Sequence, residues 1–150
     1  MHNATATLAV AAFLLATSAG SQAPVKPSST EDAQVVHLQD VKWAAPKLKE
    51  FPPGALAAAI AVDPQTGGSL GYGKFPAGYK LPTHWHSFTE YTVLLSGNAT
   101  FTVDGKAIAL SAGDYIVIPA KVHHSLTCDG SAPCVLLTRR AGPTDYHFEG

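Results

Sequence analysis

Short apolar runs separated by turn residues make up most of the chain after residue 33. The clearest is ATFTVDGKAIAL (99–110), where Ala99, Phe101 and Val103 alternate with threonines. Asp104-Gly105 then supplies the two-residue turn of a β-hairpin, in which positive φ angles are needed. Further strands are predicted at 34–40, 55–62, 69–75 and 115–119, and in HHSLTC and CVLLTRR, which flank the two cysteines.

Residues 55–62 (ALAAAIAV) are rich in alanine, which favours helices. The run is short, however, and PPG precedes it while DPQTGG follows, so the pattern predicts a strand. No segment of helical period follows residue 24, and AGPTDYHFEG (141–150) is predicted to be a polar tail. Many short strands with frequent turns predict an all-β sandwich or barrel.

Composition narrows the class of protein. The chain has 150 residues, of which 46% are hydrophobic and only 14% charged, as expected for one compact β-domain. The net charge is −1 and no basic stripe occurs, so neither nucleic acid nor an anionic membrane is an expected partner.

The N-terminus resembles an export signal. Leu8–Ala16 is apolar and is followed by small residues, so residues 1–23 are predicted to be a signal peptide, 24–33 a linker and 34–150 the β-domain. Met1–Thr7 contains no Lys or Arg, which leaves a disordered Ala-rich tail as the alternative. A membrane span is not expected, because the apolar run is too short for about 30 Å of hydrocarbon. The predicted location is the periplasm or the exterior.

Cys128 and Cys134 are the two cysteines, and five residues containing Asp-Gly and Pro separate them. In a hairpin this spacing brings the flanking strands together, so a disulfide is expected in an oxidising compartment. Two free thiols remain the alternative.

The stretch HWHSFTE (84–90) carries the candidate chemistry. His84, His86 and Glu90 have equal parity, so they would share one face of a single strand. Imidazole with carboxylate suits a transition metal rather than Ca²⁺, which prefers oxygen ligands. A fourth ligand must come from elsewhere. His123 and His124 are adjacent, so in an extended chain only one points inward, and geometry alone does not choose between them.

The pattern resembles the cupin family. Gly78, His84, His86, Glu90 and Gly97 match every defined position of the first cupin motif. The resemblance covers about residues 69–140.

The second cupin motif is matched by Gly113, Pro119 and a histidine five positions later, and this resemblance selects His124 as the fourth ligand. His123 is then expected to point outward or lie at the barrel mouth. The sequence departs from the motif at Lys121, where a glycine is usual, and at Cys128, where an asparagine is usual.

The resemblance implies an antiparallel double-stranded β-helix, or jelly-roll barrel, with the metal inside. The implied cofactor is one divalent transition-metal ion (Mn, Fe, Ni, Co, Cu or Zn) on His84, His86, Glu90 and His124, and Glu90 is also the candidate catalytic base. The implied activity is the transformation of a small oxygen-rich molecule by dioxygenase-like or Lewis-acid isomerase or lyase chemistry. The alternative is a non-catalytic periplasmic binding or sensor protein. A homodimer is also expected, with residues 34–43 as its candidate edge strand.

Overall fold

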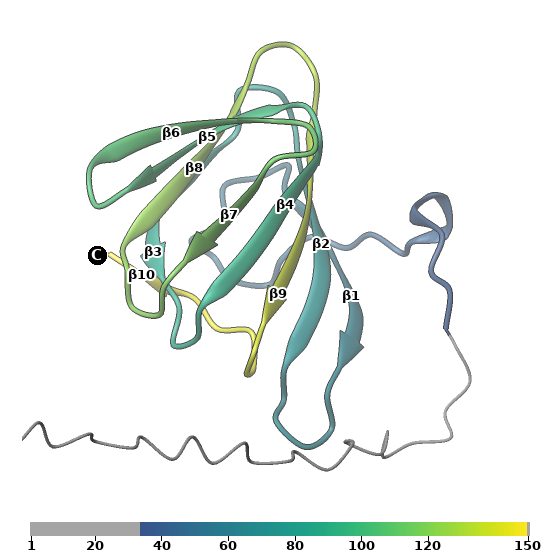
Figure 1. The fold of residues 1–150 in the computed structure, drawn as a ribbon. Helices are drawn as coiled ribbons and strands as arrows, with labels where there is room; N and C mark the ends of the chain where they lie inside the picture. The colour runs from purple at the N-terminus through teal and green to yellow at the C-terminus, as the bar shows by residue number, and fades with distance from the viewer. Residues whose placement is uncertain (1–33, 150) are drawn as a thin grey trace, which may run out of the picture. The chain divides into compact units, whose positions relative to one another are not determined.

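The computed structural model describes residues 34–149, so the predicted signal peptide and linker lie outside the described residues. These residues form one short 3-10 turn and ten strands (Figure 1). The elements are η1 (Leu38–Asp40), β1 (Leu56–Val62), β2 (Ser69–Phe75), β3 (Lys80–Trp85), β4 (Glu90–Ser96), β5 (Asn98–Val103), β6 (Lys106–Ser111), β7 (Tyr115–Ile118), β8 (His124–Asp129), β9 (Cys134–Arg140) and β10 (His147–Phe148). No helix in this part of the chain is long and apolar enough to cross a membrane.

The strands form two antiparallel sheets that face each other as a barrel (Figure 1). One sheet has the order β1-β2-β9-β4-β7 and the other β10-β3-β8-β5-β6. Consecutive strands such as β3 and β4 therefore lie in different sheets, and the chain crosses repeatedly between them. The predicted all-β jelly-roll barrel is confirmed.

Most predicted strands are present, including the hairpin of β5 and β6, whose turn residues Asp104 and Gly105 have φ of 46° and 77°. The prediction of a strand at 34–40 is wrong, and so is the prediction that residues 34–43 form an edge strand. That segment contains only η1, and a single bridge from Ala44 to Ala57 joins the N-terminal segment to β1. Its apolar residues alternate only in part, and Val35 and Val36 are exposed, so no buried face fixes a strand there.

The prediction that residues 141–150 form a polar tail is also wrong. Within this segment His147 and Phe148 form β10, which pairs with β3 opposite Trp85 and His84. Tyr146 and Phe148 pack on Phe51 with ring centroids 5.0 Å and 5.6 Å away. Burial of these aromatic rings supplies the free energy that holds the tail against the barrel.

The inward-facing residues change from apolar to polar along the barrel. At the apolar end, a disulfide between Cys128 and Cys134 joins β8 to β9, so the free-thiol alternative is excluded. The polar end holds the histidines. In order from apolar to polar end, the inward residues are Leu94, Thr92 and Glu90 on β4, Cys128, Leu126 and His124 on β8, and Cys134, Leu136, Thr138 and Arg140 on β9.

Candidate metal site

His84 and His124 are brought together by strand pairing. They are direct partners in the register of β3 with β8, and their ring centroids are 4.3 Å apart. Directly opposed residues in an antiparallel pair place their side chains next to each other on the same face. Both side chains are buried in the barrel, each with 2% of its surface exposed.

The prediction that His84, His86 and Glu90 share one strand is wrong. β3 ends at Trp85 and β4 begins at Glu90 in the other sheet, so residues 86–89 form the crossing loop. The His86 carbonyl accepts a 2.8 Å bond from the Lys121 N–H, which fixes the start of this loop. His86 and Glu90 nevertheless reach the same interior, because the loop passes from one facing sheet to the other.

The three histidines form one cluster whose candidate ligand atoms lie within 4.8 Å of one another. In each ring Nδ1 lies against a backbone carbonyl: His84 against Pro82 at 2.7 Å, His86 against Asp145 at 2.5 Å and His124 against Val122 at 3.0 Å. A carbonyl only accepts hydrogen bonds, so Nδ1 carries the proton and Nε2 keeps its lone pair.

The cluster fits a metal ion on two observations. The Nε2 atom of His124 is buried and has no hydrogen-bond partner among the described residues, which is costly unless a ligand is bound there. Burial also lowers the pKa of His84 to about 3 and lowers that of His124. Both rings are therefore neutral at physiological pH, as metal ligation requires.

Glu90 lies beside the cluster, with Oε2 3.0 Å from His86 Nε2. Thr92 donates a 2.8 Å bond to its other oxygen, and Arg140 forms a short ion pair with Oε2. Burial alone would raise the pKa of Glu90, but the Arg140 guanidinium beside it holds it below its usual range. Glu90 is thus an ionised carboxylate next to the three rings, and its ligation of a metal stays a prediction.

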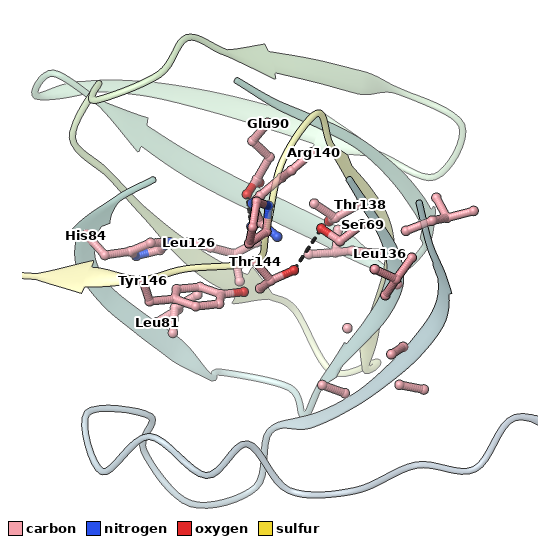
Figure 2. A pocket seen from close by; sticks show the side chains of 18 of the residues that line it. Ser69, Leu81, His84, Glu90, Leu126, Leu136, Thr138, Arg140, Thr144 and Tyr146 are labelled. Atoms are coloured by element: carbon pink, nitrogen blue, oxygen red, sulfur yellow. Dashed lines mark hydrogen bonds and ion pairs between the residues drawn. The ribbon is translucent and has the colours of Figure 1, made fainter. Parts of the chain in front are cut away.

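A cavity of about 630 Å³ adjoins the cluster, a size suited to a small organic ligand. Figure 2 shows Arg140 and Glu90 meeting at one side of it, with the Tyr146 ring extending from the other. The wall across from the histidines is formed by the small residues of β1 and β2. These include Ala57, Ala59, Ala61, Gly71 and Gly73.

Two site residues, Arg140 and Tyr146, were not anticipated from the sequence. Arg140 has 6% of its surface exposed, and its guanidinium carbon lies 5.3 Å from the Tyr146 ring. Alternation along CVLLTRR could have found Arg140, because it has the same parity as the buried Cys134 and Leu136. Tyr146 gave no such signal, because the sequence around it is polar.

His123 points outward, as expected. Its side chain has 46% of its surface exposed, and Nδ1 contacts the Glu149 carboxylate. The two departures from the second motif are accommodated locally. Lys121 takes a φ of 65°, a left-handed conformation that favours glycine, and Cys128 is used in the disulfide.

Comparisons agree with this architecture. A family model described as "Cupin domain" matches residues 71–138. Residues 71–138 therefore form a cupin domain. A search of curated protein sequences found no match.

Solved structures share the fold. The polyketide cyclase RemF from Streptomyces resistomycificus is 16% identical with a TM-score of 0.66, over 79% of this chain and 87% of that one. The Cnp3 cupin domain of Schizosaccharomyces pombe is 16% identical with a TM-score of 0.62, over 71% and 72%. A predicted oxalate decarboxylase from Thermotoga maritima is 19% identical with a TM-score of 0.62, over 72% and 98%. These neighbours include proteins described as enzymes, and at such identities the likeness concerns the fold.

Proposed function

We propose that this cupin holds one divalent transition-metal ion on His84, His86 and His124 and transforms a small organic molecule in the adjoining cavity. The observation that carries the proposal is the cluster of three buried imidazoles, each with Nδ1 at a backbone carbonyl. The Nε2 of His124 has no partner among the described residues, and that of His86 lies 3.0 Å from Arg140 Nη2. Imidazole donors suit Mn, Fe, Co, Ni, Cu or Zn. When bound, such an ion would supply Lewis-acid or redox chemistry to an oxygen-bearing substrate.

Glu90 has two roles in this proposal, as a fourth ligand or as a proton acceptor. Its lowered pKa keeps it ionised at neutral pH, but a carboxylate held by Arg140 is a weak base. It becomes a stronger base when a ligand takes over the Arg140 contact. Burial raises the pKa of Tyr146, so its phenol stays protonated and can donate a hydrogen bond toward the cavity.

A non-catalytic binding or sensor protein is the second candidate. The observation that favours it is that Glu90 is already bonded to both Thr92 and Arg140, which leaves no free base beside the histidines. Export to the periplasm or beyond and assembly as a homodimer are further parts of the proposal; both follow from the sequence and the family resemblance.

Metal analysis tests the site directly. The purified protein is expected to carry about one transition-metal ion per chain, and His86→Ala or His124→Ala should weaken metal binding by at least about 100-fold. His123→Ala is the matched control, because it removes a neighbouring imidazole that points outward. Equal metal content in all four proteins would contradict the proposed site.

Activity separates the two candidates. The metal-loaded protein would be incubated in D₂O with a panel of small keto acids and diketones, with O₂ consumption measured in parallel. Deuterium uptake that disappears in Glu90→Gln supports proton abstraction by Glu90, and O₂ uptake supports a dioxygenase. Tight binding with neither reaction across the panel favours the binding protein and overturns the enzyme.

A further inference from the structure

Arg140 is a buried cation whose hydrogen-bonding capacity is only partly used. It lies at the end of the inward face of β9 and lines the cavity. The same atom, Nη2, contacts both Glu90 and the Nε2 of His86, the latter at 3.0 Å. Arginine offers five N–H donors, and Nε of Arg140 is buried without a hydrogen-bond partner among the described residues. An unpaired buried donor of this kind is costly, and an acceptor on a ligand would relieve the cost.

The charges around the cavity also favour an anion. The titratable groups that line it are His84, Glu90, His124, Arg140 and Tyr146. Glu90 and Arg140 form an ion pair with each other, so these two opposite charges cancel. Asp145, the residue before Tyr146, is bonded instead to the Ser87 N–H and to His147. A divalent cation would therefore leave an excess positive charge, and even the metal-free cavity has no net negative charge to repel an anion.

The opposite wall is apolar and made of small side chains. Ala57 pairs with Gly73 and Ala59 with Gly71 in the register of β1 with β2, and all four residues line the cavity. Side chains this small leave space that larger residues would fill. A ligand that matches both walls carries a negative group at one end and an apolar body at the other.

We propose that Arg140, with Tyr146 beside it, binds the carboxylate of an organic acid whose apolar body lies along the Ala/Gly wall of β1 and β2. Planar guanidinium groups match carboxylates through paired N–H donors, and the Tyr146 hydroxyl points into the same cavity (Figure 2). The proposal deepens the proposed function by naming its substrate class. It depends on the proposed function only for the assumption that the ligand binds in this cavity. The carboxylate contact itself does not depend on a metal, because Arg140 lines the cavity in either case.

Binding of matched acids and amides tests the proposal. The probes are benzoate, 3-phenylpropionate and octanoate, each beside its neutral amide, titrated calorimetrically into metal-free protein and into Zn²⁺-loaded protein. We expect at least one acid to bind metal-free protein about tenfold or more tightly than its amide. If no acid binds, or if acids and amides bind equally to the metal-free protein, the proposal is overturned.

Variants assign the preference to these residues. Arg140→Lys should reduce the preference, and Arg140→Met combined with Glu90→Gln should abolish it. The double variant removes the buried charge pair together, so that neither charge is left unpaired. Ala59→Leu should weaken acid and amide alike by filling the apolar wall. Lys74→Gln, a charge loss on the opposite face of β2 beside Trp43, is the control and should change nothing. A preference that persists in the double variant would overturn the role of Arg140.

The metal measurements keep this proposal separate from the proposed function. If the histidine variants show that no metal is bound while metal-free protein still prefers acids through Arg140, the metal site fails and the carboxylate subsite stands. If metal binds as proposed but the acid preference appears only in Zn²⁺-loaded protein, the carboxylate binds the metal and the Arg140 proposal is overturned.

Discussion

The two ends of the barrel are built from the same strands but by different physical means. At the apolar end, Leu94 and Leu136 are buried and the disulfide joins β8 to β9. At the polar end, the same strands bury imidazoles, a carboxylate and a guanidinium. Burying apolar side chains is favourable, whereas burying polar groups costs free energy unless they are bonded.

The difference indicates where stability and chemistry are located. The polar groups are partly compensated by bonds to backbone carbonyls and to Thr92, but His124 Nε2 and Arg140 Nε are left without partners among residues 34–149. A fold keeps such an uncompensated region only when the rest of the core is strong enough. Changes at the polar end should therefore be sensitive to protons and ligands, and changes at the apolar end should affect stability alone.

Acid should destabilise the metal-free protein through the polar end. The pKa of His84 falls from its ordinary value of 6.5 to about 3 in the folded state, because the ring is buried. Between these values the unfolded chain binds a proton that the folded chain does not. The contribution of His84 to the free energy of unfolding is thus fully present above pH 6.5 and is lost by about 1.4 kcal/mol per pH unit below it, and the lowered pKa of His124 makes the total slope steeper. Urea unfolding at pH 7.5, 6.5, 5.5 and 5.0 measures the slope.

Variants identify the source of this slope. Above pH 5 ordinary carboxyl groups are ionised in both states, so the buried histidines dominate. His84→Gln should make the dependence shallower and leave the share of His124, whereas His123→Gln, at the exposed neighbour of His124, should not change it. Equal slopes in wild type and His84→Gln would contradict the assignment.

Truncation at the apolar end should lower stability without affecting the site. Leu94 is completely buried, and Leu94→Ala is expected to cost about 3 kcal/mol through lost burial and a cavity. Leu95, the next residue, is 38% exposed and serves as the matched control, with an expected loss below about 1 kcal/mol. Chemical unfolding measures both, and metal content should be unchanged. Similar losses in the two variants would contradict the division between the ends.

Local patterns were sufficient to predict the barrel and most of the histidine cluster. Turn signals and alternation located the hairpin of β5 and β6, and the cupin motif spacing pointed to His124 rather than His123. Equal parity predicted that His86 and Glu90 face the barrel interior from one strand. Both side chains do face the interior, but they lie on a loop and on a different strand, because parity does not indicate where a strand ends. The crossing loop between the sheets depends on long-range contacts such as that from Lys121 to the His86 carbonyl.

The C-terminal segment shows why the rest could not be predicted. Tyr146 enters the cavity only because Phe148 and Phe51 pack together and β10 pairs with β3. Two residues of strand carry no periodicity, so no local pattern distinguishes them from a polar tail. Arg140 was detectable by alternation, but a cation at an inward position contradicts the usual expectation for a core.

Removal of the disulfide should destabilise the apolar end by a smaller amount than the loss of Leu94. The bridge spans a sequence separation of six residues, and a loop of this size is worth on the order of 2 kcal/mol. Replacing Cys128 and Cys134 together by alanine should lower the free energy of unfolding by that amount and leave metal content intact. A reducing agent should lower the stability of the wild type in the same way and leave the double variant unaffected. If reduction does not change the wild type, the bridge contributes nothing.

One position at the polar end should gain stability. Lys121 has a φ of 65°, and a left-handed conformation costs residues with a Cβ about 1–2 kcal/mol, part of which glycine loses again through chain entropy. Lys121→Gly should therefore raise the free energy of unfolding by about 0.5–1 kcal/mol, measured by urea unfolding at pH 7.5. Lys80→Gly, the same change in the extended backbone of β3, should lower it by a similar amount. A loss of stability in both variants would show that the Lys121 turn is not strained. A gain in Lys121→Gly alone, with metal affinity retained, would show that the backbone of the polar end can be improved without altering its buried charges.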